Sequence, residues 1–587
     1  MRARFIHILS KTILWVLASV IILVSLVVVA LYLPPVQDFA VKKVLSSINS
    51  DPSRHVGIGR LRLTPPLHLK ADDITYIEAG DTIASLDLLD LDVSLLSVFK
   101  GEIGINELSL DSIRFNMGSP DSAMCIRSRM DHARLADAGI GLVSKNIGIG
   151  LLSVSGTDFA LDIRPDSTAT ADTTSASAPM PWKIELDQFR IDSLNYRMTM
   201  RPSIDSLTAC IPAALIENTS IDLSGQTVDV KSLIIEHLSA IYLTPPATDT
   251  PDDTSIPADG PTATTDTVAS TPWTIKVAGI DIKADSALYG VAGATPLPGL
   301  DIDCLQMTEV AIGIDSLSSR GSELRVPIRR ITAHERCGLD IRLQGLFAMD
   351  ADSLNISDME LATMHSRLTL DAMMGLKEKG MPMPVKVKGN GYVSPVDAGI
   401  AMPALTPLVA GVPETSLLDL NIDLDGHDGT YDVKDISARL PRCFDIAAKG
   451  TLTGLPDMPA SDGHLTLSGH VADGRWTRPA LVAAKLDKTL RVPPLTLDGN
   501  VNLRRGTVAG NLKAFTTGGK ISLDASWTGT REAYDLNLTA DRFPIEAFMP
   551  LLGVERVSAT AGVKGSGYDP FKKSTNINAD LHVTDIT

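Results

Sequence analysis

LDLLDLDVSLL, residues 86–96, alternates aliphatic side chains with acidic or small polar ones. From the fourth residue on, the apolar side chains take every second position: Leu89, Leu91, Val93 and Leu95. Successive side chains in a strand point to opposite faces, so this spacing predicts a strand with one aliphatic and one polar face. LDLNIDLD, residues 418–425, shows the same alternation far along the chain.

The pattern recurs from about residue 54 to the end, for example in HLTLSG (464–469), KISLDAS (520–526) and YDLNLTA (534–540). We therefore predict a mainly β chain whose strands form one elongated, curled repeat sheet with a groove along its apolar face. The predicted sheet segments are 54–164, 182–244 and 272–587. We expect the last segment to continue beyond this chain, which then represents the N-terminal part of a longer protein. The residues expected to line the groove are Leu89, Leu91, Val93, Leu95, Leu108, Leu110, Phe189, Ile191, Leu418, Leu420, Ile422, Leu424, Leu465, Leu467, Ile521, Leu523, Leu536 and Leu538.

One sequence motif occurs twice, as PWKIELDQFRIDSLNY (181–196) and PWTIKVAGIDIKADSALY (272–289). ELSLDSIRF (107–115) has the same pattern, with Asp-Ser between two apolar pairs. Each Pro-Trp follows a run of Thr, Ala, Asp, Pro and Ser, within residues 165–181 and 245–271. Such runs bury too little apolar surface to offset the entropy of ordering. We predict disordered loops that are inserted at the rim of the sheet between adjacent strands.

The N-terminus predicts a membrane anchor. Residues 1–11 carry three basic side chains, and residues 12–33 contain no charge over 22 positions. A helix of that length spans roughly 33 Å, enough for a bilayer core of about 30 Å. A cleaved signal peptide is the alternative, but its apolar region is shorter and precedes a small-residue site. The basic tip places the N-terminus in the cytoplasm and the bulk of the chain across the membrane.

Helical patterns are few. Residues 34–50 have apolar side chains at steps of four, which predicts a short amphipathic helix that lies on the membrane surface or caps the fold. IAMPALTPLVAG (400–411) and FPIEAFMPLLG (543–553) are short, contain proline and are each followed by a new alternating stretch. We predict that both are helical plugs or caps between runs of strands.

Composition excludes several functions. The net charge is −17 and aromatic residues make up 4% of the chain, which disfavours binding to nucleic acid. The five cysteines are far apart and form no CxxC pair, so neither a zinc nor a redox site is indicated. We expect these cysteines to be small apolar fillers in strands.

No catalytic motif is evident. NIDLDGHDGTYD (421–432) approaches a calcium-binding loop, but it begins with Asn and ends with Asp instead of Glu. Its apolar residues also continue a strand pattern, so we predict a strand that runs into a glycine-containing turn. The carboxylates occur mainly as the polar members of alternating strands, and no pair stands out as catalytic. We expect neither enzymatic activity nor a cofactor or metal.

The opening of the chain resembles a known family. The segments that carry the likeness are LYLPPVQDFAVKKVL, VGIGRLRLTPPLHLKADDITY and DTIASLDLLDLDVSLLSVFKGEIGINELSLDSIRF, within residues 12–116. They are similar to the start of TamB, a subunit of the translocation and assembly module in the AsmA-like group, in its Bacteroides-type versions. The resemblance implies a periplasmic β-groove anchored in the inner membrane that carries phospholipids toward the outer membrane. It also implies an Omp85-type outer-membrane partner, bound through a C-terminal region outside this chain.

Two functions follow as hypotheses. In the first, the aliphatic groove holds phospholipid acyl chains, and lipids move along it without chemistry. In the second, the chain is a scaffold or chaperone for the insertion and secretion of outer-membrane β-barrel proteins, which bind to strand edges by β-augmentation. A third hypothesis, a passive surface solenoid, is disfavoured by the retained anchor.

Overall fold

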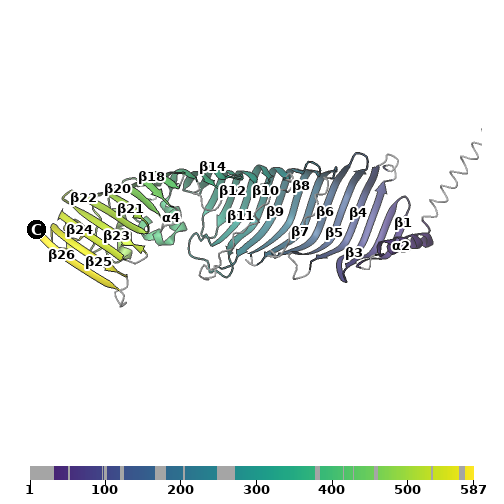
Figure 1. Cartoon of the computed structure of the whole chain (residues 1–587), viewed down its shortest axis with the longest axis horizontal. Coiled ribbons are helices and arrows are strands. Elements are labelled where there is room, and N and C mark those ends of the chain that lie inside the picture. The colour runs from purple at the N-terminus through teal and green to yellow at the C-terminus, as the bar shows by residue number, and fades with distance from the viewer. Residues whose placement is uncertain are drawn as a thin grey trace, which may run out of the picture. The chain divides into compact units, whose positions relative to one another are not determined.

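The computed structural model describes residues 32–50, 53–94, 97, 102–118, 124–164, 180–201, 205–246, 272–376, 384–413, 415–427, 429–454, 461–529, 533–567 and 575–587. The predicted anchor, residues 12–33, lies outside this part except for Tyr32 and Leu33. No helix in the described ranges is long and apolar enough to cross a bilayer. The prediction of a mainly β fold is confirmed, and in each of two compact units, Met1–Ala294 and Thr295–Thr587, the sheet is curled and unclosed (Figure 1).

The described residues of the first unit form ten strands, and each strand pairs with the next one in the chain. Alternating side chains and short turns favour such a meander. The strands are β1 (Arg54–Thr64), β2 (His68–Glu78), β3 (Asp81–Ser94), β4 (Glu102–Met117), β5 (Met124–Gly141), β6 (Asn146–Ile163), β7 (Lys183–Met200), β8 (Asp205–Asp222), β9 (Thr227–Thr244) and β10 (Thr274–Val291).

Two neighbouring pairs in this unit are parallel, β6 with β7 and β9 with β10. They flank the two polar runs of the sequence. Parallel neighbours start at the same edge of the sheet, so Ile163 and Lys183 lie at opposite rims. The polar runs thus join adjacent strands, as expected, but periodicity did not show that these neighbours are parallel. The predicted disorder of residues 165–181 and 245–271 falls almost entirely outside the described residues.

Both copies of the repeated Pro-Trp motif lie directly before a strand. Trp182 and Trp273 directly precede β7 and β10. The ammonium group of Lys145 lies 5.1 Å from the centre of the Trp182 ring, and the Lys183 N–H donates to the Lys145 carbonyl at 2.9 Å. The cation–π contact and the hydrogen bond fix where β7 begins, beside the start of β6.

The repeated Asp-Ser marks a bulge. In β7, Asp192 and Ser193 are both exposed, Ser193 has a φ of 65°, and the ladder to β6 skips from Asp192 to Leu194. Ser112 in β4 has a φ of 55°, and the pairing of Asp285-Ser286 in β10 is irregular. Short polar residues tolerate this left-handed conformation better than bulky ones. The bulge inserts one extra residue, which shifts the alternation of side chains by one position. Apolar side chains beyond the bulge, such as Leu194, therefore lie again on the less exposed face.

These irregularities line up across the unit. Asp73, Ser112, Gly156, Ser193 and His237 all have positive φ, and the ladders on both sides skip these positions. We call this the bulge line. A second line of skipped positions crosses β4 to β9. Bulges bend and twist a strand, so aligned bulges make long strands curl together.

One helix covers the edge of β1. It is α2 (Pro34–Ile48), which lies within the predicted range 34–50. The Gln37 amide donates to the Leu63 carbonyl at 2.8 Å and accepts from the Leu63 N–H at 3.3 Å. Asn49, just after α2, makes the same pair of bonds to Val56, at 3.0 and 2.7 Å. Two side-chain amides thus replace a neighbouring strand and block this edge.

The second unit contains sixteen strands, each antiparallel to the next. They are β11 (Cys304–Arg320), β12 (Glu323–Glu335), β13 (Asp340–Met349), β14 (Ser353–Ala362), β15 (Arg367–Gly375), β16 (Val385–Val393), β17 (Leu418–His427), β18 (Thr430–Leu440), β19 (Phe444–Thr453), β20 (Asp462–Val471), β21 (Leu495–Arg504), β22 (Thr507–Thr516), β23 (Gly519–Thr528), β24 (Ala533–Phe543), β25 (Val557–Ser566) and β26 (Asn576–Ile586). The stretch that approaches a calcium loop contributes to β17, as predicted.

Short helices interrupt this unit after every fourth strand from β16. They are α4 (Pro395–Ala401), η1 (Pro403–Leu405) and α5 (Thr406–Val409), then η3 (Arg475–Thr477) and α6 (Arg478–Ala483), then α7 (Ile545–Phe548) and η5 (Pro550–Leu552). The first and third groups match the predicted plugs, whereas sequence reasoning missed the second. Successive groups touch: α5 packs on α6, and the Arg491 N–H donates to the Phe548 carbonyl at 2.7 Å.

Candidate functional site

The candidate site is the apolar face of the sheet within each unit, where register aligns apolar residues from strand to strand. In the first unit, two rows of side chains meet directly across all ten strands. Row A is Leu63, Leu69, Leu91, Leu108, Leu135, Leu152, Phe189, Ile216, Leu233 and Ile280. Row B is Leu61, Ala71, Leu89, Leu110, Ala133, Val154, Ile191, Ala214, Ile235 and Ile282. Every position in both rows is apolar, and the rows run for roughly 43 Å at the usual strand spacing.

The opposite face is different in character. The residues between rows A and B on that face begin with Arg62, Lys70, Asp90 and Ser109 and continue with Arg134. Many of these side chains are paired, for example Lys70 with Asp90 at 2.8 Å and Arg134 with Glu107 at 2.6 Å. The sheet therefore separates an aliphatic surface from a charged one, as strand alternation requires.

Rows A and B are shielded without being covered. All twenty side chains are buried or half-buried, and the most enclosed are Ala71, Ala214 and Ile280, with Ala71 only 2% exposed. In the described part of this unit the only helix of more than one residue is α2, and α2 packs on the edge strand β1. An apolar face of this extent is larger than most soluble proteins leave open.

In the second unit a row of the same kind crosses fifteen strands, from β12 to β26. Row C is Val326, Phe347, Ile356, Ala372, Val387, Leu424, Val433, Gly450, Leu465, Val501, Gly510, Ala525, Leu536, Val563 and Ala579. Two further rows follow one after the other beside row C on the same face. The nearer row includes Ile422, Leu467, Leu523 and Leu538, and the row beyond it includes Leu420 and Ile521.

This face is hollowed between β20 and β24. A cavity of about 560 Å³ is lined mainly by aliphatic side chains together with Trp527 and Tyr534, which lie directly opposite each other on β23 and β24. Leu512 and Trp527 are 39% and 44% exposed, so large apolar side chains remain accessible here. A concave aliphatic wall with hardly any polar group suits an apolar chain and offers little to a sugar or a base.

The predicted lining residues fall on these rows. Leu91, Leu108 and Phe189 belong to row A, Leu89, Leu110 and Ile191 to row B, and Leu424, Leu465 and Leu536 to row C. Leu467, Leu523 and Leu536 line the hollow of the second unit. Val93 lies opposite Ile105, and Leu418 lies opposite Val393, at the ends of their strands. Leu95 lies outside the described residues.

Little in the described residues points to chemistry at this face. No group of three His, Cys, Asp or Glu side chains within the described ranges is placed to hold a metal. All five cysteines are free. Cys125, Cys210 and Cys304 lie in strands, as expected, whereas Cys337 and Cys443 lie in turns and the prediction is wrong for these two.

Comparison with protein-family models, curated proteins and solved structures finds no match for this chain.

Proposed function

We propose that the apolar face carries lipid acyl chains, and that the chain is a TamB-like lipid conduit between the inner and the outer membrane. The observation that supports this most directly is the alignment of rows A, B and C, where apolar side chains meet across every strand pair. Each methylene of an acyl chain kept from water on such a surface gains about 0.8 kcal/mol. Because neighbouring positions along a row are chemically alike, a bound chain can slide without a large barrier.

The outward face of α2 supports a location at a membrane surface. On this helix, Val36, Val44 and Ile48 recur at multiples of four residues and are 37%, 56% and 49% exposed, and Lys42 and Lys43 precede Val44. An apolar stripe flanked by lysines is typical of helices that lie in the interface of a bilayer. The uncharged segment 12–33 ends where α2 begins, so an anchor there brings α2 and the first strands to the membrane.

The same structure is less favourable to a scaffold that binds client strands. Within each unit, the described strands other than the first and the last pair with a strand on both sides, so their backbone N–H and C=O groups are already bonded. The edge of β1 is blocked by the Gln37 and Asn49 amides. β-Augmentation needs an open row of N–H and C=O groups, which this edge does not offer.

Photo-crosslinking tests the proposal with matched pairs of neighbouring residues. A diazirine amino acid replaces Leu110 or, on the opposite face of the same strand, Ser109; Leu523 and Ser522 form the second pair. We expect phospholipid adducts at Leu110 and Leu523 and few at the two serines. Protein adducts at the leucines would favour the scaffold, and equal lipid labelling at all four sites would refute a conduit on this face.

A further inference from the structure

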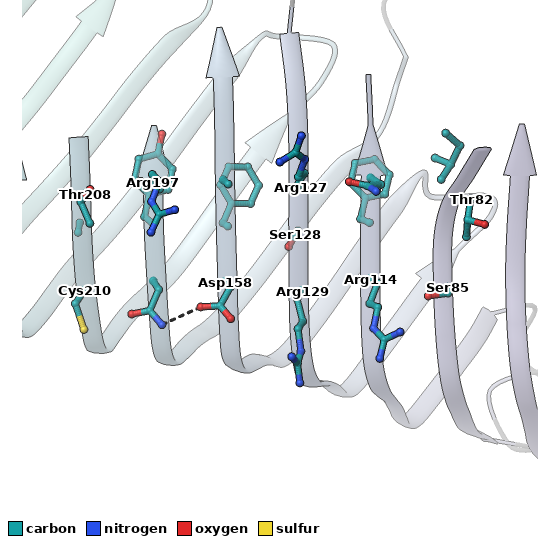
Figure 2. Close-up of a pocket in the computed structure, with 18 residues that line it drawn as sticks. Thr82, Ser85, Arg114, Arg127, Ser128, Arg129, Asp158, Arg197, Thr208 and Cys210 are labelled. Carbon is teal, nitrogen blue, oxygen red and sulfur yellow. Dashed lines mark hydrogen bonds between the residues drawn. The ribbon is translucent and has the colours of Figure 1, made fainter. Parts of the chain in front are cut away.

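The face opposite rows A and B carries a second hollow in the first unit, across β3 to β8 (Figure 2). Its volume is about 710 Å³. Four arginines line it: Arg114 on β4, Arg127 and Arg129 on β5, and Arg197 on β7. Figure 2 shows them projecting from neighbouring strands in two bands, with Arg114 and Arg129 in one and Arg127 and Arg197 in the other.

This hollow is separate from the apolar face. Neighbouring residues of a strand point to opposite sides, so Arg114 and Phe115 cannot share a face. Phe115 lies opposite Ser128, Ser128 opposite Phe159, and Phe159 opposite Tyr196, whose ring stacks on that of Phe159 with centres 5.7 Å apart. These aromatic side chains belong to the apolar side, and their backbone forms the floor of the arginine hollow.

The four arginines lie close together although their positive charges repel one another. Arg114 lies directly opposite Arg129, a pairing of like charges that destabilises a sheet. Arg127 and Arg197 lie on either side of Ala160, which separates them by two strand spacings, about 10 Å. In a chain of net charge −17, such a gathering of cations is unusual.

Few carboxylates neutralise them. Arg129 approaches Asp131 at 3.5 Å, and both side chains are more than 60% exposed, so this ion pair is weak. Asp158 lies across from Arg129 but accepts the Asn195 amide at 2.9 Å. Within the described residues, no carboxylate lies within ion-pair distance of Arg114, Arg127 or Arg197. Elsewhere on the same face, Arg134, Lys70 and Lys283 are each paired with a carboxylate.

We propose that this hollow binds a ligand with two phosphate groups. The guanidinium fork matches a phosphate with two parallel hydrogen bonds, and a bound anion removes the repulsion between Arg114 and Arg129. The spread of the four arginines accommodates two anionic groups, not one. Asn195, held by Asp158, and the Ser85 and Thr208 hydroxyl groups supply further donors at the edge of the hollow. The ligand is either a soluble phosphorylated compound or the phosphorylated head group of a lipid at a membrane surface.

Titration calorimetry of the full chain with inorganic pyrophosphate tests the site. The double variant Arg114→Gln, Arg127→Gln removes one arginine from each band. The matched control is Arg190→Gln, an exposed arginine on β7 and on the same face, outside the hollow. We expect pyrophosphate affinity to fall about tenfold or more in the double variant and less than about twofold in the control. Equal affinity in all three proteins, or equal loss in both variants, would overturn the proposal.

The alkylation rate of a single cysteine distinguishes loss of binding from misfolding of the variant. Cys210 lies in the hollow and is exposed, whereas Cys125, Cys304 and Cys443 are buried. We expect pyrophosphate to slow alkylation of Cys210 by iodoacetamide in the wild-type chain, while the double variant reacts at the same rate with or without it. Unchanged alkylation of the wild-type chain would contradict binding at this place.

Vesicles separate the two sources of phosphate. The probes are phosphatidylcholine vesicles with and without a lipid that carries two phosphates. Protection of Cys210 by pyrophosphate alone assigns a soluble ligand, and protection by the diphosphorylated vesicles assigns a lipid head group. Protection by neither refutes the site. Because this hollow lies on the opposite face, these outcomes do not depend on lipid binding to rows A, B and C.

Discussion

Each of the two units has an apolar face, and the two faces are built in different ways. β5 to β10 have 18 residues each, about 60 Å of strand, whereas β13 to β26 have 9 to 11 residues, roughly 33 Å. The long strands curl at aligned bulges and include two parallel pairs. The short strands are all antiparallel and are interrupted by helices. Strand length thus sets the width of the face, while its continuity depends only on register.

The first prediction compares wide and narrow faces and has the largest effect. An aspartate within an apolar row places an unpaired charge in the path of acyl chains. In the narrow second unit we expect Leu523→Asp to reduce lipid adducts at Leu467 by about tenfold or more. In the wide first unit, where lipids can bypass one residue, Leu152→Asp should reduce adducts at Leu108 less. The control Ser522→Asp lies on the opposite face, and a loss there would contradict the assignment of faces.

The second prediction concerns the bulge line of the first unit. Gly156 has a φ of +60°, and a Cβ atom there would clash with the Asp131 carboxylate. We expect Gly156→Val to lower the free energy of unfolding of this region by about 3 kcal/mol. Native-state hydrogen exchange of β6 measures it. The control is Gly148→Val on the same strand, where a Cβ meets no atom within 4 Å. Equal losses would show that the bulge conformation is not required.

The third prediction concerns the helices of the second unit. Asp397, 5% exposed in α4, accepts hydrogen bonds from Thr363 and Ser366 in the turn between β14 and β15. Burial acts to raise its pKa, but the hydrogen bonds from Ser366, Thr363 and His365 outweigh burial and lower the pKa below its usual value of about 4. The carboxylate therefore stabilises this unit above about pH 4, and that stability is lost as pH falls through the lowered pKa.

Acid titration followed by hydrogen exchange of β14 to β16 checks this prediction. Protection of these strands should decline below about pH 4 in the wild-type chain. Asp397→Asn should show reduced protection at neutral pH and a smaller further decline in acid. The long strands β5 to β7, which lack such an insert, provide the internal reference. A decline of equal size in both units would argue against a specific role for Asp397.

The smallest effect is expected at the edge of β1. Gln37→Leu removes both hydrogen bonds to Leu63 while the helix keeps its shape. We expect local exchange of the Leu63 amide to become faster by an amount equivalent to about 1–2 kcal/mol. Lys42→Gln, on an exposed part of α2, serves as the control. Unchanged exchange at Leu63 would mean that the amide bonds contribute nothing measurable to the edge.

Local spacing alone was enough to predict the mainly β fold and many of the side chains that lie in the apolar rows. Alternation with a period of two is a local property, so Leu108, Leu420 and Leu523 were placed on the aliphatic side without knowing any partner strand. The helix within residues 34–50 and two of the three helical inserts were predicted for the same local reason. The Asp-Ser repeats were visible too, but one sequence alone did not show that they mark a bulge.

Only the tertiary structure decided what depends on pairing. Register aligned the rows, β6 and β9 paired with their next strands in parallel, and Gln37 and Asn49 met the edge of β1. Strand pairing also brings together Arg114, Arg127, Arg129 and Arg197, which in the sequence are ordinary polar residues of three strands. Cross-strand neighbours are far apart in the chain, and their register follows from the packing and turns of the whole sheet, so local spacing does not encode it.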